Sequence, residues 1–292
     1  MTATLRTIGG RPVLRMERRL AHPPGKIWRA LTEPAHLSQW YPFKATELDL
    51  RVGGKIRFDN GQGMIMDAVI TELDPPRVFA FSERAPAEME RESYDLVHFE
   101  LRPDGAGCLL IFTHTFDDRP AAGSYASGWH QCLDAMELLL DGRPIELPDV
   151  SAELHERYVA AFGLTEGWVE QTADGWRVRF ERQLMQQPID KVWAALNSSG
   201  APTIGDRVPP VFTADPIPAG AVTAVEPPTL LEYAWLFAGQ PAGRVRWRLS
   251  RGPGGARISL AQTGPSDLAD QQPAALAAWQ SRLERFVKQL VE

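Results

Sequence analysis

The chain has little of what would reveal its chemistry at once. Its 292 residues include only two cysteines, Cys108 and Cys132. Two cysteines are too few for a disulfide framework or a structural zinc site, so both are interpreted as small buried hydrophobic residues. No stretch approaches the roughly 20 apolar residues of a membrane span, and the first residues lack the apolar core of a signal peptide. These absences predict a cytoplasmic protein without a membrane partner.

Catalytic motifs are missing as well. The chain has no His-Glu-x-x-His, no Gly-x-Ser-x-Gly, no phosphate loop and no Gly-x-Gly-x-x-Gly before a helix. Its six histidines are scattered without the spacing of metal ligands. The sequence therefore predicts no catalytic residue, no metal site and no cofactor, and it leaves open whether the protein is an enzyme.

Acidic residues outnumber basic ones, 37 to 31, and the charge is uneven along the chain, with one candidate basic stripe. The net charge of −6 divides into −3 over residues 1–145, −5 over residues 146–173 and +2 over residues 174–292, which argues against a nucleic-acid partner. The stripe consists of Arg244, Arg246 and Arg248, which period-2 spacing places on the outer face of a strand. It is interpreted as a solvated sheet face, with an acidic partner or the acidic connector as the alternative. The acidic run 83–92 is expected to be a solvated loop.

What the chain does have is an internal repeat. Residues 14–31 return as 178–196, residues 70–76 as 222–228, and residues 97–101 as 245–249; a final helical block around Trp129 returns around Trp279. Four matched blocks in the same order indicate the duplication of one domain rather than a short-period solenoid. We expect a first domain over residues 1–145, an acidic connector with a short helix over 146–173, and a degenerate second domain over 174–292.

The pattern within one repeat predicts an α+β fold. Residues 13–20 predict a strand, Pro24 begins a short helix, and residues 34–40 predict a second one. Period-2 runs separated by turn residues then predict about six antiparallel strands between residues 46 and 116. A long helix is expected over 121–140. A curved antiparallel sheet wrapped around a long C-terminal helix can enclose a space between them.

Several short motifs of the first half resemble a known family. They are Glu17-Arg18, Trp28, Pro34, Trp40, Gly53-Gly54, Asp74-Pro75-Pro76, Val97, Phe99, Leu101, Thr113-His114 and Gly128-Trp129. Together they resemble the bacterial relatives of the activator of the 90-kDa heat-shock-protein ATPase, within the START-like, birch-pollen-allergen-like helix-grip (SRPBCC) superfamily. The resemblance covers nearly all of residues 12–142. It is degraded in the second half, which has no counterpart of Gly53-Gly54. It implies two tandem helix-grip domains, the first with a cavity.

One histidine is placed by strand parity in that cavity. His114 follows Leu110 and Phe112 on the face that the resemblance implies is inward. It could hydrogen-bond a ligand or move a proton near neutral pH, or it could be a histidine satisfied by a neighbouring hydroxyl or backbone group. Its counterpart in the second half is Gln262, which cannot titrate.

The expected ligand-binding residues form an aromatic and Met-rich set that is equally consistent with an ordinary core. They are Trp40, Phe58, Met66, Phe79, Phe81, Phe99, Phe112, His114, Trp129 and Leu133. The sequence predicts that the first domain binds a small hydrophobic molecule and that the second is structural or regulatory. Two alternatives stay open. One is a chaperone co-factor or other protein-interaction module, as the family name suggests, although the separate N-terminal module of the eukaryotic activators is not expected here because residue 12 begins the first strand. The other is a cyclase or aromatase acting on a polyketide-like substrate, by fold analogy.

Overall fold

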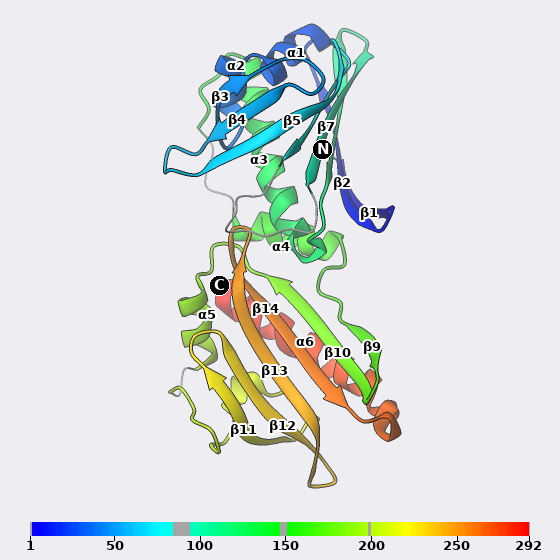
Figure 1. Cartoon of the computed structure of the whole chain (residues 1–292), viewed down its shortest axis with the longest axis vertical. Helices are drawn as coiled ribbons and strands as arrows, with labels where there is room; N and C mark the ends of the chain where they lie inside the picture. Colours follow the sequence, from blue (N-terminus) through cyan, green and yellow to red (C-terminus); the bar gives the residue numbers. More distant parts are fainter. Residues whose placement is uncertain (1, 84–93, 147–150, 198–199, 292) are drawn as a thin grey trace. The chain divides into compact units, whose positions relative to one another are not determined.

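The chain folds into two compact units, Met1–Val150 and Ser151–Glu292, which we call the first and second domains (Figure 1). The structure is a computed structural model that describes residues 2–83, 94–146, 151–197 and 200–291. Each domain has one antiparallel sheet and one long C-terminal helix. The expected α+β class with two helix-grip domains is confirmed.

The first domain has an eight-stranded sheet. Its elements are β1 (Thr2–Ile8), β2 (Arg11–Leu20), α1 (Pro24–Thr32), α2 (Pro34–Trp40), β3 (Lys44–Leu48), β4 (Lys55–Asp59), β5 (Ile65–Asp74), β6 (Val78–Glu83), β7 (Asp95–Asp104), β8 (Gly107–Thr115) and α3 (Ala122–Leu140). The strand order is β1-β2-β8-β7-β6-β5-β4-β3. The sequence analysis missed β1, whose residues are partly or fully exposed and which pairs only with β2.

The signature Gly53-Gly54 has a steric reason. Gly53 has φ +80° in the turn between β3 and β4, a conformation that disfavours other residues. A Cβ on Gly54 would lie 1.9 Å from the carbonyl oxygen of Asp49. The backbone of this turn therefore approaches itself too closely for any side chain at position 54.

The second domain has a six-stranded sheet. Its elements are α4 (Ala152–Ala161), β9 (Trp168–Thr172), β10 (Gly175–Gln183), α5 (Ile189–Leu196), β11 (Ala219–Glu226), β12 (Leu230–Phe237), β13 (Gln240–Gly252), β14 (Gly255–Gly264) and α6 (Gln272–Val291). The strand order is β11-β12-β13-β14-β10-β9. β9 lies before residue 174, where the sequence analysis began this domain, and it pairs with β10.

The connector helix α4 is tied to the second domain. The Ser151 hydroxyl accepts a hydrogen bond from the backbone N–H of Leu154 at 3.0 Å, which caps the helix. Glu156 of α4 accepts a hydrogen bond from the buried guanidinium of Arg182 on β10. Burial alone would raise the pKa of Glu156, but hydrogen bonds from His155 and Arg182 and their positive charge outweigh it, so the pKa is lowered.

Candidate functional site

The candidate site is the interior of the first domain, formed by α2, α3 and strands β4 to β8. All ten residues expected to bind a ligand are buried there, each with at most 8% of its surface exposed. Whether they touch a ligand stays a prediction. Strand alternation explains the placement: β7 buries every second residue from Asp95 to Leu101, and β8 buries Cys108, Leu110, Phe112 and His114 on the same face, with Ile111 buried on the other.

The aromatic members of the set are packed ring against ring. The rings of Phe112 and Trp129 have centroids 4.3 Å apart, and those of Phe99 and Phe112 are 5.2 Å apart. Tyr41, which the sequence analysis did not select, stacks on Phe58 at 4.6 Å and meets Trp129 edge-on at 5.8 Å. The network thus joins residues from α2 to α3 across the sheet, and Tyr41 is at its centre.

Two side chains anchor His114 at one end of this network. The indole N–H of Trp129 donates to Nδ1 of His114 at 3.2 Å. An indole can only donate, so Nδ1 carries no proton. Nε2 of His114 lies 3.1 Å from Oδ2 of Asp95, which accepts its hydrogen. The imidazole is therefore held as one neutral tautomer, and the partner that the sequence analysis sought in a hydroxyl or backbone group is a carboxylate and an indole.

The second domain repeats this contact with a residue that cannot titrate. The indole N–H of Trp279 donates to Oε1 of Gln262 at 2.6 Å, in the place of Trp129 and His114. Both acceptors are buried, with exposures of 3% for His114 and 1% for Gln262. In both domains a buried acceptor on the last strand holds the tryptophan of the long helix by one hydrogen bond. Because Gln262 does this as well as His114, the contact does not require an imidazole.

A second polar pair lies near the first. The phenol of Tyr41 donates a hydrogen bond to Glu83, the last residue of β6. The expectation of a solvated loop is wrong for Glu83, while residues 84–92 lie outside the described ranges. Burial raises the pKa of Tyr41, and the negative charge and hydrogen bond of Glu83 raise it further. Glu83 also lies directly across from Asp95 in the pairing of β6 with β7. Two carboxylates therefore occupy neighbouring strands at one end of an aromatic interior.

Nucleophilic chemistry is disfavoured at both cysteines of the first domain, Cys108 and Cys132, because burial raises the pKa of each thiol. Burial raises the pKa of Cys132 to about 12, so that its thiol is protonated at neutral pH. Among residues 2–83, 94–146, 151–197 and 200–291, no group of three or more His, Cys, Asp or Glu side chains could hold a metal ion. The arrangement suits hydrogen bonding by fixed groups at the end of a packed aromatic interior.

The sequence analysis missed Tyr41, Glu83 and Asp95. For Asp95 the signal was available: it is two residues before Val97 and four before Phe99, so parity places it on the inward face of β7. Tyr41 follows α2 and has no periodicity to place it. Glu83 lies at the start of an acidic run, which is typical of solvated loops.

A family model matches most of the first domain. Residues 21–141 match the family model described as Activator of Hsp90 ATPase homolog 1-like protein. No curated protein matches the chain. No described helix is long and apolar enough to span a membrane.

The solved structures that this chain is similar to include those of CalU16 and DynU16. CalU16 from Micromonospora echinospora is 23% identical over 55% of this chain and 95% of its own, with a TM-score of 0.45. DynU16, from the dynemicin biosynthetic locus, is 16% identical over 96% of this chain and 99% of its own, with a TM-score of 0.43. A protein of Mesorhizobium loti is 26% identical over 45% of this chain and 98% of its own, with a TM-score of 0.41.

Proposed function

Because residues 21–141 belong to the family of Activator of Hsp90 ATPase homolog 1-like proteins, we propose that the first domain uses its interior to bind a small hydrophobic molecule. The molecule's apolar part lies against the aromatic network, and a polar group at its end meets the pairs Tyr41–Glu83 and His114–Asp95. The second domain has a structural role.

The observation that carries this proposal is the contrast between the two interiors. Glu83 and Asp95 face each other across β6 and β7, and Trp235 and Gly243 occupy the corresponding pair on β12 and β13. A Cβ on Gly243 would lie 2.5 Å from Nε1 of Trp235, so the tryptophan ring takes the space of a side chain at position 243. The indole of Trp235 is itself bonded to the carbonyl oxygen of Thr263 at 2.6 Å.

The same filling continues at the end of β14. Phe116 in the first domain corresponds to Gly264 in the second, where a Cβ would lie 2.3 Å from the ring of Trp176. The rings of Trp176 and Trp235 have centroids 6.0 Å apart. Where the first domain holds two carboxylates, a histidine and a tyrosine, the second domain is filled by two tryptophans: Trp235, whose indole is bonded to Thr263, and Trp176, whose buried indole N–H has no hydrogen-bond partner among the described residues. Buried polar groups are a reason to expect a binding partner, whereas a filled core is typical of a structural domain.

The test transfers the filled interior to the first domain. The full chain is titrated with Nile red, an uncharged apolar dye whose fluorescence rises in an apolar site. The variant Glu83→Trp/Asp95→Gly, which copies Trp235 and Gly243, is expected to weaken dye binding at least tenfold. Trp235→Phe in the second domain is the control and should bind as wild type does. Circular dichroism confirms that each variant is folded.

A milder variant keeps the test decisive if the double variant does not fold. Tyr41→Phe retains the ring that stacks on Phe58 and removes only the phenol hydroxyl. It should leave Nile red binding intact and weaken binding of 1-naphthol about threefold to tenfold, the scale of one hydrogen bond, because the proposal places the ligand's hydroxyl against the phenol oxygen of Tyr41. The site would be in the second domain if two results came together. Glu83→Trp/Asp95→Gly would bind Nile red as tightly as wild type, and Trp235→Phe would abolish binding.

The alternatives from the sequence are separated by other readouts. A chaperone co-factor would change the ATPase rate of a 90-kDa heat-shock protein without needing the interior, so Glu83→Trp/Asp95→Gly would retain that effect. A cyclase or aromatase would convert a polyketide-like substrate and depend on the same residues as binding.

A further inference from the structure

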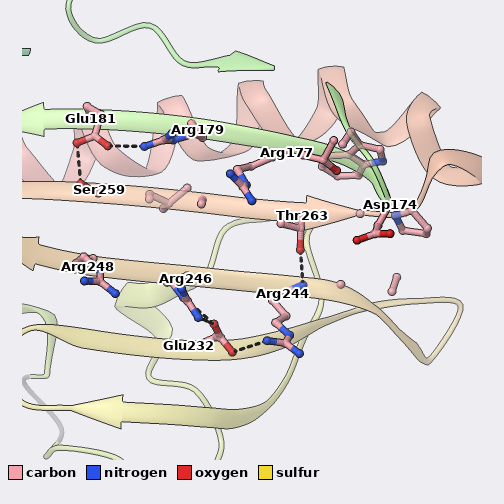
Figure 2. A pocket seen from close by; sticks show the side chains of 18 residues that line it. Asp174, Arg177, Arg179, Glu181, Glu232, Arg244, Arg246, Arg248, Ser259 and Thr263 are labelled. Carbon is pink, nitrogen blue, oxygen red and sulfur yellow. Dashed lines mark hydrogen bonds and ion pairs between the residues drawn. The ribbon is translucent and has the colours of Figure 1, made fainter. Parts of the chain in front are cut away.

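A basic groove lies on the outer face of the second domain's sheet, away from the interior. It is an open pocket of about 730 Å³, and Figure 2 shows its arginines on both sides of β14. From this groove we infer a second binding site, specific for a compact polyanion that bears phosphate or carboxylate groups. This inference is independent of the proposed function.

The strand order builds the groove. β14 is flanked by β10 on one side and by β13 on the other. The outward residues of β14 are small: Ser259, Ala261 and Thr263. Since neighbouring strands are about 4.8 Å apart, the two flanking strands are about 10 Å apart, and long side chains on them form walls above a low floor.

The strand pairing aligns the side chains in three rows across the groove. In the first row Arg177 pairs with Thr263, and the backbone N–H of Arg244 donates to the hydroxyl of Thr263 from the other side. The second row is Arg179, Ala261 and Arg246, and the third is Glu181, Ser259 and Arg248. Successive rows are two residues apart along the strands, or about 6.7 Å. Five guanidinium groups thus face one groove in a protein whose net charge is −6.

Three carboxylates line the groove, Asp174, Glu181 and Glu232, and the last two are engaged with two of these arginines. Glu232 lies on β12, next to β13, with 5% of its surface exposed, and it accepts a hydrogen bond from Nε of Arg246 at 2.7 Å. Glu181 accepts from Arg179 at 3.2 Å and from the hydroxyl of Ser259 at 2.7 Å. These pairs hold Arg179 and Arg246 in place.

The other three arginines keep donors available for a ligand. Arg177 and Arg244 reach Glu170 and Glu232 only at 3.6 Å, which is too long for a hydrogen bond. Arg248 makes no hydrogen bond or ion pair with any residue in the described part of the chain. The Thr263 hydroxyl accepts the backbone N–H of Arg244 at 3.2 Å and keeps its own hydrogen to donate. Two guanidiniums and a hydroxyl around one point are a suitable donor set for a phosphate or carboxylate group.

The first domain serves as an internal comparison. The same rows there are Val13, Thr115 and Leu96; Arg15, Thr113 and His98; and Glu17, Ile111 and Glu100. These nine positions carry one arginine and two glutamates, against five arginines and one glutamate in the second domain. The matching face of the first domain forms without such an excess of positive charge. Solvation of a sheet face therefore does not explain the five arginines of the second domain.

The size and charge of the groove favour a compact anion over a polymer. Three rows span only about 13 Å, and an acidic protein repels a long polyanion outside this groove. The sequence analysis interpreted the stripe Arg244, Arg246 and Arg248 as a solvated face and kept an acidic partner as the alternative. The pairing with Arg177 across β14 favours the alternative.

The experiment uses the full chain and two probes, inorganic tripolyphosphate and citrate, by isothermal titration calorimetry at 50 mM salt. Wild type should bind at least one of them, more weakly at 300 mM salt because of screening, and the stronger probe identifies the preferred group. Arg177→Gln/Arg244→Gln should weaken binding at least tenfold. Arg157→Gln/Arg285→Gln removes the same charge from exposed helical sites off the groove and should bind within twofold of wild type.

A single variant guards against misfolding. Arg248→Gln breaks no hydrogen bond or ion pair among the described residues, so its urea midpoint should equal that of wild type while its affinity falls about threefold or more. Binding of neither probe by wild type, or equal losses in the groove and control variants, would overturn the site. Binding of a 12-nucleotide DNA strand or of polyglutamate without competition by either probe would also overturn it, in favour of a polymer.

Discussion

Replacing His114 in two ways tests the reasoning about the interior most sharply. Neutral His114 accepts one hydrogen bond from Trp129 and donates one to Asp95. The amide of glutamine offers the same pair, an acceptor and a donor, and Gln262 already accepts from Trp279 in the second domain. We therefore expect His114→Gln to change the free energy of unfolding of the first domain by at most about 1 kcal/mol.

Replacement by leucine removes both bonds. The indole N–H of Trp129 is then buried without its acceptor, which costs about 1–3 kcal/mol, and the Asp95 carboxylate loses a donor, which costs about 1.5–3 kcal/mol. We expect His114→Leu to destabilise the first domain by about 3–5 kcal/mol. The matched variant Gln262→Leu affects only the bond from Trp279 and should cost the second domain about 1–3 kcal/mol.

The assay must report each domain separately, because the transitions of two domains can overlap in an optical signal. Hydrogen exchange of peptides from α3 and α6, measured over a urea series, gives the two free energies independently. If His114→Gln proved as destabilising as His114→Leu, a charged imidazole rather than a neutral acceptor would be what the site needs, and the argument from Gln262 would be refuted.

Three further predictions concern stability. The raised pKa of Tyr41 means that the folded state favours the protonated phenol, so the stability of the first domain should be fully present below pH 10 and fall as the pH rises further. Tyr41→Phe should reduce that fall, measured by urea melts over a pH series. An unchanged dependence of stability on pH in this variant would contradict the role of the phenol. Glu156→Gln leaves Arg182 buried without its carboxylate and should destabilise the second domain by about 3 kcal/mol. Hydrogen exchange of α4 peptides measures this, and an unchanged free energy of unfolding would mean that α4 is not held by this pair. Gly243→Ala would place a Cβ 2.0 Å from the carbonyl oxygen of Thr263 and should lower the urea midpoint by the equivalent of about 1–3 kcal/mol, whereas Gly25→Ala, with no atom within 4 Å, should leave it unchanged.

Strand parity accounts for what could be predicted. The inward placement of His114 and the aromatic set follows from period 2 in β7 and β8, and the helix stripe of Trp129 and Leu133 follows from the helical period. The repeat predicted two helix-grip domains because the duplicated blocks keep their order. These signals are local in sequence.

What parity could not provide is the register between neighbouring strands and the pairing of strands that do not follow one another in the chain. Glu83 and Asp95 meet only because β6 pairs with β7 in one register, and Arg177 faces Arg244 only because both β10 and β13 pair with β14. The tautomer of His114 likewise depends on Trp129, a residue on another element. β1 was missed because its exposed residues show no alternation.

The most direct test of the central claim uses the two tryptophans that hold the long helices. The full chain is labelled with ¹⁵N at its tryptophan indoles, the signals are assigned with single Trp→Phe variants, and Nile red is added. A molecule bound in the first interior should shift the indole signal of Trp129 and leave that of Trp279 unchanged, since only the first interior is expected to hold the dye. A shift of Trp279 with Trp129 unchanged would contradict the account, because it would place the binding site in the domain whose interior is filled by its own tryptophans.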